Sequence, residues 1–174
     1  ASQNTSYLVV SAKASWFDAA LYCMDRGGAL ATIATAAQNA LIIELLTNAS
    51  VDHAYLGGND HAKEGTWVWA DGQSMDVTYS DWDSGQPDNW GGNEHCLTMV
   101  NVLAKTHSWA NQQKWVDYSC TEELPFVCQD THRPPMSLQN ISYLVVASPK
   151  LRWFDAAQYC ADRGGMLAKI ASSS

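Results

Sequence analysis

The amino-acid sequence predicts an α+β domain with two helices, small antiparallel sheets and one long irregular loop region. Two segments within the first fifty residues carry helix caps and an apolar face. From residue 51 onward the chain changes to short β-prone runs separated by turns. Residues 72–95 are rich in Gly, Asp, Asn and Ser with little periodicity, and a stretch of this length inside a domain is usually functional.

Both helices are predicted from their first residues. Ser15 is a candidate N-cap, and Gly27–Gly28 is the stop signal of that helix. Its apolar face is made of Trp16, Ala19, Ala20 and Cys23. Thr35 with Gln38 forms a capping-box pattern that opens a second helix. The second helix has a broad apolar stripe (Leu41, Ile42, Leu45 and Leu46), so we expect it to pack against a sheet.

The strands are predicted from short runs of β-branched and aromatic residues. The candidates are residues 7–10, 54–56, 67–69, 96–100, 115–117 and 126–128. The first of them is expected at a sheet edge near the N-terminus.

Composition excludes several classes of function. The 174 residues carry a formal net charge of −8 without a basic run, which argues against nucleic acid as a partner. No apolar run approaches the roughly 20 residues of a membrane span, so membrane insertion is not expected. The chain has neither a Gly-x-Ser-x-Gly nor a His-Glu-x-x-His motif, and we do not expect an enzyme.

The loop around Pro87 combines oxygen donors with an indole. Gln86, Asp88 and Glu94 place an amide and two carboxylates within nine residues, between glycines and asparagines. Ca²⁺ takes six to eight oxygens from such groups. Trp90 in the same loop offers a flat apolar face to a ligand; the alternative is a core or linker tryptophan, which its polar, Gly-flanked setting disfavours. The pattern favours a calcium site with an aromatic platform.

Several separate motifs resemble one known family. Residues 86–96 read Gln-Pro-Asp-Asn-Trp-Gly-Gly-Asn-Glu-His-Cys, and residues 115–120 read Trp-Val-Asp-Tyr-Ser-Cys. Residues 55–58 (Tyr-Leu-Gly-Gly) and 67–72 (Trp-Val-Trp-Ala-Asp-Gly) precede them. Their order and spacing over residues 5–129 resemble C-type lectin-like domains. The resemblance implies a C-type lectin fold, with the irregular stretch as its calcium and ligand loop region.

The resemblance also implies a disulfide pattern and an extracellular setting. Its two bridges would be Cys23–Cys128 and Cys96–Cys120, which leaves Cys160 unpaired. Such bridges persist in oxidising compartments, so a secreted protein is expected. Three Asn-x-Ser/Thr sequons, beginning at residues 4, 48 and 140, fit secretion.

Carried onto this chain, the family's calcium ligands would be Gln86, Asp88, Glu94 and Asp117, with Pro87 in the cis form. The position of one further family ligand, an asparagine, is occupied by Val116. With one oxygen from each of three ligands, two from Asp117 and two sugar hydroxyls, the set still reaches about seven oxygens, within the range for Ca²⁺. Asn89, Asn93 and Asn111 are candidates for the vacancy.

Some members of the family carry an auxiliary calcium site. Asp60 and Glu64 match two of its ligands by their spacing ahead of Gly65, whereas Asn89 and His95 stand where acidic ligands are expected. We therefore expect no auxiliary calcium site, and a solvated surface for Asp60 and Glu64.

The Gln-Pro-Asp order is associated in this family with galactose-like sugars, and the Glu-Pro-Asn order with mannose-like ones. Exchanging amide and carboxylate reverses the hydrogen-bond polarity across the ion. The resemblance thus implies calcium-dependent binding of terminal galactose or N-acetylgalactosamine, with Gln86, Asp88, Trp90, Glu94 and Asp117 at the ligand. The alternative is a domain without sugar binding that recognises a protein, mineral or ice surface, which Val116 favours.

The C-terminal part of the chain repeats its beginning. Residues 142–146 repeat Ser-Tyr-Leu-Val-Val of residues 6–10, and residues 153–157 repeat Trp-Phe-Asp-Ala-Ala of residues 16–20. We divide the chain into a recognition domain (1–129), a linker (130–141) and an incomplete second copy (142–174). Three interpretations of Cys160 stay open: an orphan of a cut tandem protein, an exchange in which residues 142–170 replace residues 6–33 of a neighbouring chain and Cys160 takes the partner of Cys23, or a direct bridge to a second chain in a homo-oligomer.

Overall fold

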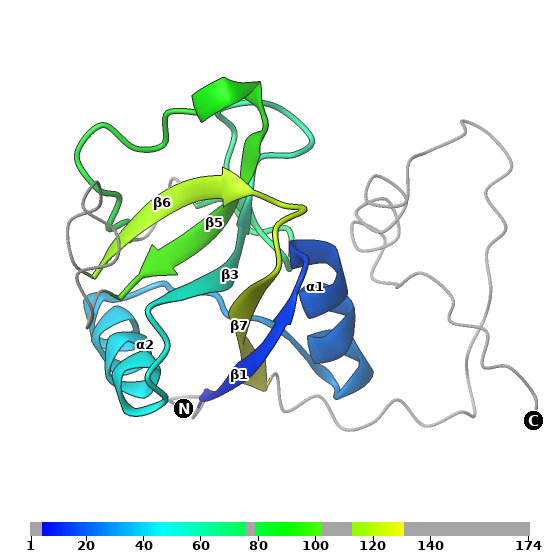
Figure 1. Cartoon of the computed structure of the whole chain (residues 1–174), viewed down its shortest axis with the longest axis vertical. Coiled ribbons are helices and arrows are strands. Elements are labelled where there is room, and N and C mark those ends of the chain that lie inside the picture. The colour runs from blue at the N-terminus through cyan, green and yellow to red at the C-terminus, as the bar shows by residue number, and fades with distance from the viewer. Residues whose placement is uncertain (1–4, 76–78, 102–112, 131–174) are drawn as a thin grey trace, which may run out of the picture. The chain divides into compact units, whose positions relative to one another are not determined.

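The described residues form a seven-stranded sheet with two helices, in a computed structural model that describes residues 5–75, 79–101 and 113–130 (Figure 1). The chain divides into units 1–134 and 135–174, and all described residues lie in the first. The strands are β1 (Ser6–Ala14), β2 (Gly28–Leu30), β3 (His53–Asn59), β4 (Val68–Trp69), β5 (Glu94–Val100), β6 (Lys114–Ser119) and β7 (Leu124–Asp130). The helices are α1 (Trp16–Asp25), α2 (Ala36–Asn48) and the 3₁₀ turn η1 (Trp90–Gly92).

The sheet is mixed, although most of its pairs are antiparallel. The strand order is β1-β7-β3-β5-β6, with β2 also paired to β7 and β4 to β3. β3 and β7 pair in parallel at Tyr55 and Phe126, which the sequence analysis did not foresee. β1 lies at the edge, as predicted, and Ser6 pairs with Asp130. The two ends of the described domain are therefore neighbours.

Helix α1 begins and ends where the sequence predicts. The Ser15 side chain accepts a hydrogen bond from the Asp18 N–H, and Gly27 follows the helix at φ +79°. The buried face consists of Trp16, Ala19, Ala20 and Cys23. The Trp16 indole donates to the Leu56 carbonyl at 2.8 Å and so fixes α1 to β3.

The second glycine of the stop signal belongs to a strand that the sequence analysis missed. β2 pairs with β7, and a Cβ atom at Gly28 would lie 2.3 Å from the Gln129 carbonyl oxygen. Only glycine fits this approach of two backbones. Gly27 turns the chain and Gly28 lets it pair, so the dipeptide serves two purposes.

Helix α2 is capped by Thr35, whose hydroxyl accepts from the Gln38 N–H at 3.2 Å. Ile42 and Leu46 are fully buried in the core cluster, whereas Leu41 is 42% exposed. The stripe that packs is therefore narrower than the sequence suggested, because a helix presents only part of its circumference to a neighbour. The core cluster continues into the sheet through Leu56, Leu97 and Trp115.

Both expected disulfides are present. Cys23 on α1 is bonded to Cys128 on β7, with a Cα–Cα distance of 5.5 Å. Cys96 on β5 is bonded to Cys120 just beyond β6, with a Cα–Cα distance of 5.2 Å. The first bridge closes the domain, and the second fixes the two strands that flank the long loop.

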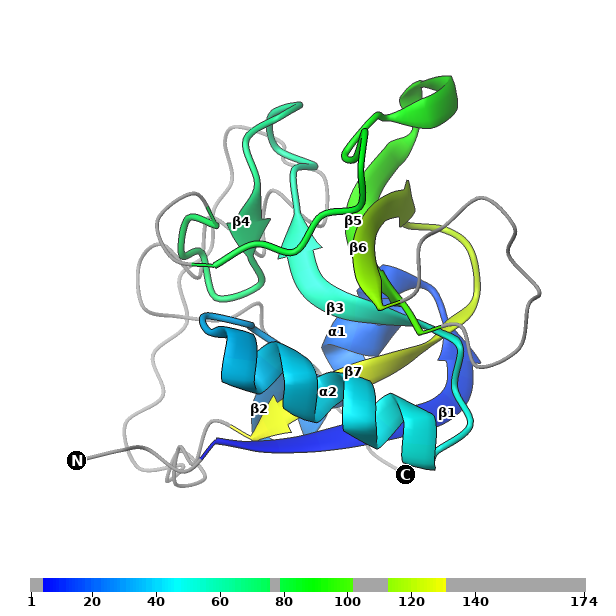
Figure 2. The ribbon, with the colours of Figure 1, turned by 90° about the vertical axis from the view of Figure 1, so that its left-hand side faces the viewer.

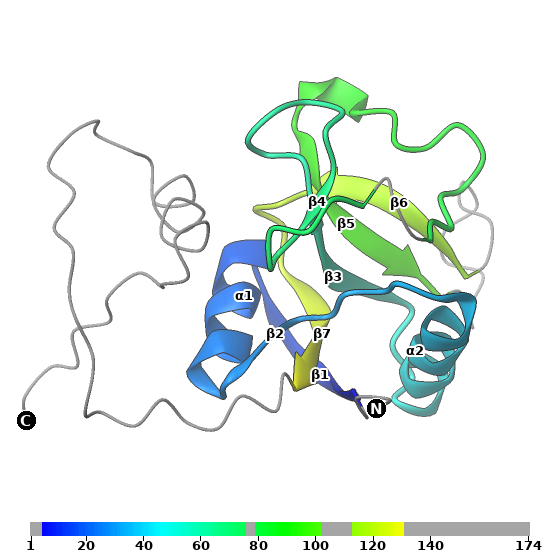
Figure 3. The ribbon, with the colours of Figure 1, turned by 180° about the vertical axis from the view of Figure 1, so that it is seen from behind.

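The part of the long loop that carries η1 lies at the end of the domain away from α2, whereas Asp81, earlier in the loop, accepts a hydrogen bond from the Asn39 side chain on α2 at 2.9 Å. In Figure 2 and Figure 3 the segment with η1 rises above the sheet, and α2 lies below it. The loop leaves β4, passes through the Gln86–Pro87 peptide and η1, and returns as β5. The sheet and its bridges thus present this loop at one face of the molecule.

Candidate functional site

Three carboxylates from distant parts of the chain meet at the end of the loop. Asp88 comes from the loop, Glu94 is the first residue of β5, and Asp117 lies on β6. One ligand atom from each lies within 4.8 Å of the other two. We call these three residues the first cluster. Three of the four metal ligands expected from the sequence are therefore together.

Asp117 anchors the loop to β6. Its two carboxylate oxygens accept hydrogen bonds from the Asp88 N–H at 3.1 Å and from the Asn89 N–H at 2.7 Å. The residue is 3% exposed, and burial raises the pKa of its carboxyl, although the backbone donors act in the opposite direction. A buried carboxylate that ties down two amides of the loop sets the position of Asp88.

Glu94 is held in place by the loop itself. Its carboxylate accepts from the Trp90 N–H at 3.1 Å, and its own N–H donates to the Asn89 side-chain oxygen at 3.0 Å. Burial, followed by the nearby negative charge of Asp117, raises the pKa of Glu94 to about 7. Asp88 adds to the repulsion. A bound cation would offset the repulsion among these carboxylates.

Gln86 lies beside the first cluster. Its side-chain oxygen accepts a 3.4 Å hydrogen bond from the Asp117 N–H, and the Gln86–Pro87 peptide is cis. Gln86, the fourth expected ligand, thus contacts β6 at the same residue, Asp117, that supplies the buried carboxylate. Amide and carboxylate oxygens flank the cis peptide on its two sides.

Trp90 stands on the surface, 77% exposed. It opens η1, in which Gly91 and Gly92 both have positive φ. An indole this exposed does not contribute to the core. Its backbone N–H donates to Glu94, so the residue is adjacent to the first cluster along the chain.

Val116 is part of the packed interior. It is 1% exposed and clusters with Val100. Trp115, on the opposite face of β6, packs in the core cluster. Because successive strand residues point to opposite faces, the Val116 side chain lies on the face away from Asp117.

The three asparagines that could replace the missing calcium ligand differ in their surroundings. The side chain of Asn89 is engaged at both ends, since its oxygen accepts from the Glu94 N–H and its Nδ2 donates to Glu64 at 2.6 Å. Asn93 is exposed at the surface. Asn111 lies outside the described residues, as do Cys160 and the repeat of residues 142–174.

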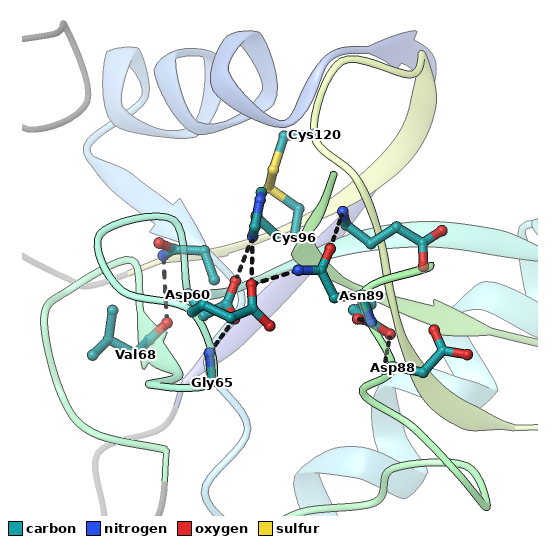
Figure 4. Close-up of polar contacts among 12 residues, drawn as sticks. Asp60, Gly65, Val68, Asp88, Asn89, Cys96 and Cys120 are labelled. Carbon is teal, nitrogen blue, oxygen red and sulfur yellow. Dashed lines mark hydrogen bonds and ion pairs between the residues drawn. A yellow bond between two sulfur atoms is a disulfide. The ribbon is translucent and has the colours of Figure 1, made fainter. Parts of the chain in front are cut away.

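A second group of possible ligands lies on the other side of Asn89. Asp60, Glu64 and His95 each offer one atom within 4.8 Å of the others, and we call them the second cluster. Figure 4 shows Asp60 with Gly65 on this side and Asp88 on the other, with Asn89 between them. The expectation of a solvated Asp60 is wrong, because the residue is only 2% exposed. Glu64 is at the surface, as expected.

Asp60 is buried because it closes the turn that follows β3. One of its carboxylate oxygens accepts from the Gly65 N–H at 2.7 Å. Gly65 has φ +72°, a conformation in which glycine is favoured. The spacing of an aspartate five residues before a glycine was the available signal in the sequence. The polar composition of residues 59–65 concealed it.

An aromatic hollow of about 390 Å³ lies close by but apart from both clusters. It is lined by residues that include Trp67, Met75, Tyr79, Trp82 and Pro87. None of the carboxylates of the two clusters lines it. The hollow is therefore separate from both clusters, in each of which one carboxylate is buried (Asp60 and Asp117) and one is exposed (Glu64 and Asp88).

The donor set of the first cluster fits Ca²⁺. All of its donors are oxygens, three of them carried by carboxylates, and Gln86 adds an amide. Among the described residues no Lys or Arg forms an ion pair with these carboxylates. A divalent cation would offset the negative charge that raises the pKa of Glu94.

Comparison with known proteins identifies the family. The sequence model of the family described as the lectin C-type domain matches residues 12–130. The chain belongs to the C-type lectin domain family. The fold prediction is thereby confirmed together with its two disulfides.

Two curated relatives illustrate the likeness. Collectin-10 of Gallus gallus is 30% identical over 123 residues, which cover 71% of this chain and 40% of collectin-10. The matched part thus spans less than half of that relative. Salivary C-type lectin 2 of Aedes albopictus is 35% identical over 135 residues, covering 74% of this chain and 84% of the relative.

Two solved structures have the same fold and different descriptions. The carbohydrate-recognition domain of the human scavenger receptor C-type lectin is 29% identical, with a TM-score of 0.61 over 73% of this chain and 91% of that one. A Ca²⁺-dependent type II antifreeze protein is 33% identical, with a TM-score of 0.62 over 74% and 94%. One is described as a carbohydrate-recognition domain and the other as an antifreeze protein, so the family alone does not select a ligand.

No helix among the described residues is long and apolar enough to cross a membrane.

Proposed function

We propose that this C-type lectin domain binds terminal galactose or N-acetylgalactosamine through Ca²⁺ held by Gln86, Asp88, Glu94 and Asp117. One observation carries the proposal: one carboxylate oxygen each from Asp88, Glu94 and Asp117 converge within 4.8 Å of one another, in a region whose loop also carries the exposed Trp90. Bound Ca²⁺ would supply open coordination positions for two sugar hydroxyls.

The protein's own side chains would orient the sugar. Gln86 presents an amide and Asp88 a carboxylate on either side of Pro87. The amide would donate hydrogen bonds to the sugar hydroxyls, and the carboxylate would accept hydrogen bonds from them. Trp90 offers its exposed indole to the apolar face of galactose. Asp117 and Glu94 hold the loop through the N–H groups of Asp88, Asn89 and Trp90.

The test is retention on galactose-agarose with elution by EDTA. The matched variant is the double exchange Gln86→Glu with Asp88→Asn, which keeps one amide, one carboxylate and the net charge. We expect the parent to bind galactose-agarose and the exchanged variant to move to mannose-agarose. Retention that resists EDTA contradicts the calcium-bridged mode, and retention of both proteins on the same sugar contradicts the role of the pair.

A second candidate function is recognition of a protein, mineral or ice surface without sugar. It is supported by the buried Val116, which supplies no ligand oxygen, and by the likeness to the antifreeze protein. Ice-growth inhibition and mineral adsorption, assayed with and without Ca²⁺, separate this function from the first. Activity there, combined with no retention on either sugar, would replace the galactose proposal.

The two disulfides support secretion, because such bonds persist in oxidising compartments. A homo-oligomer through Cys160 is part of the same proposal and would strengthen binding by multivalency. Non-reducing electrophoresis beside Cys160→Ser tests it. A parent that is wholly monomeric with one titratable thiol excludes the covalent dimer.

A further inference from the structure

The second cluster differs from the first in one donor, the imidazole of His95. Its Nδ1 atom lies 3.1 Å from a carboxylate oxygen of Asp60 and 3.4 Å from one of Glu64. We propose that Asp60, Glu64 and His95 form a site for a divalent transition-metal ion of the Zn²⁺ class, separate from the calcium site. This inference does not rest on the proposed galactose function.

The spacing of the donors suits such an ion. Zinc–nitrogen and zinc–oxygen bonds of about 2.0–2.2 Å at tetrahedral angles place neighbouring ligand atoms about 3.4 Å apart. The two measured separations from His95 are close to that value, and all three atoms lie within 4.8 Å of one another. Little rearrangement is needed for the three side chains to meet one ion.

The donor chemistry selects against calcium here. Ca²⁺ prefers oxygen ligands, whereas imidazole suits Zn²⁺, Cu²⁺ and Ni²⁺. Asn89 does not restore the missing oxygen, because its Nδ2 points at Glu64 and its oxygen accepts from the Glu94 N–H. The remaining set is one imidazole nitrogen with two carboxylates, and both donor types bind zinc.

Asp60 is prepared for this role by its surroundings. It is a buried carboxylate, and among the described residues no Lys or Arg pairs with it. The Gly65 N–H holds one of its oxygens, while the other faces His95. A hydrogen bond of this kind orients a metal ligand without competing for the coordinating atom. A buried charge needs a partner, and a cation shared with His95 and Glu64 supplies one.

Access is provided from the solvent side. The side chain of Glu64 is 57% exposed and that of His95 is 27% exposed. The ring of His61 lies near, with its centroid 5.9 Å from that of His95. Water would complete a tetrahedral set.

The test is a Zn²⁺ titration of the full chain in saturating Ca²⁺, read by competition with a chromophoric chelator. All proteins carry Cys160→Ser, because a free thiolate also binds zinc. We expect one Zn²⁺ per chain. His95→Gln should weaken zinc by at least about tenfold, since even changes behind the ligands cost 10–100-fold in zinc sites. Asp88→Ala, in the first cluster, should lose calcium and bind zinc as before.

A second pair of measurements keeps the proposal falsifiable if a variant folds poorly. Zn²⁺ should shift the ring nitrogen signals of His95 in the parent itself, as observed by NMR. His95→Asp should convert the cluster to oxygens alone, lose zinc and bind a second Ca²⁺. Absent zinc uptake, unchanged uptake in His95→Gln, or unshifted His95 signals would each overturn the site.

Discussion

The two clusters lie close to each other and offer different donor chemistry. Glu94 and His95 are adjacent on β5, yet Glu94 joins the first cluster and His95 the second. Strand alternation explains this, because neighbouring side chains point to opposite sides. Asn89 lies between the two and is bonded to Glu64 on one side and to the Glu94 N–H on the other. The residue at position 95 thus decides whether the second cluster contains only oxygen donors, because His95 supplies its one nitrogen.

The clusters also differ in how their negative charge is balanced. In the first, three carboxylates face one another, and burial and repulsion raise the pKa of Glu94 to about 7. In the second, two carboxylates face an imidazole at hydrogen-bond distance from Asp60. The first cluster therefore depends more strongly on a cation, and the largest effects are expected there.

Asp88→Ala is expected to have the largest effect of any single change. It removes a charged ligand from the first cluster, and calcium affinity should fall by at least about two orders of magnitude, since ligand charge tunes such sites over that range. Galactose binding should disappear with it. Asp88 is exposed, so folding is not at stake. Calorimetric titration with Ca²⁺ measures the effect.

The matched control is Glu64→Ala, an exposed carboxylate of the second cluster. It should leave calcium and galactose binding in place while weakening zinc. Equal calcium losses in both variants would mean that the two clusters act as one site.

Lowering the pH from 7 to 6 should reduce the calcium affinity by up to about tenfold for each carboxyl that must lose a proton before calcium binds. Glu94, with its pKa of about 7, is the group responsible, and the raised pKa of Asp117 adds in the same direction at lower pH. Calcium titrations at several pH values, repeated with Glu94→Gln, measure the effect. A calcium affinity that is flat between these pH values contradicts it.

The calcium-free domain should respond to pH with the opposite sign. The folded-state pKa of Glu94 lies above its ordinary value of 4.5, so the folded form holds this proton more tightly than the unfolded form. Stability should therefore fall as the pH rises from about 4.5 to about 7, and added calcium should restore it above that range. Thermal unfolding in EDTA and in calcium tests both halves.

Trp90→Ala should have a smaller and more selective effect. The indole touches ligand rather than ion in the proposed function, so calcium affinity should stay unchanged. Galactose binding should weaken by roughly 1–2 kcal/mol, the scale of a lost aromatic contact, or about 5- to 30-fold. Inhibition of galactose-agarose binding by free sugar provides the measurement. Trp90→Phe, which keeps an aromatic face, should lose less than Trp90→Ala.

The scaffold could be predicted from the sequence because its signals are local. Ser15 and Thr35 satisfy helix N–H groups within three residues of themselves, and a cap needs no tertiary information. The parallel pairing of β3 with β7 was not predicted, since it joins residues about seventy positions apart. The disulfides came from the resemblance rather than from spacing.

The site could be predicted only where one segment carries it. Asp88, Trp90 and Glu94 stand in one loop, and the resemblance added Asp117 from a distant strand. Asp60 was misjudged because its burial depends on a turn closing over the end of β3, which composition does not reveal. The importance of Val116 was likewise argued from its position in the motif, without knowledge of the face it occupies.

Val116→Asn should change calcium least of all, although it restores the residue that the family carries at this position. Val116 packs with Val100 on one face of β5 and β6, while Trp115 belongs to the core cluster on the other face. An asparagine here would be buried without reaching Asp88, and a buried polar group without partners costs about 1–3 kcal/mol of stability. We expect a lower melting temperature and an unchanged calcium affinity. Val100→Asn is the matched control, because it places the same amide in the same apolar pair. If Val116→Asn tightens calcium while Val100→Asn does not, the amide reaches the first cluster and our assignment of the strand face is wrong.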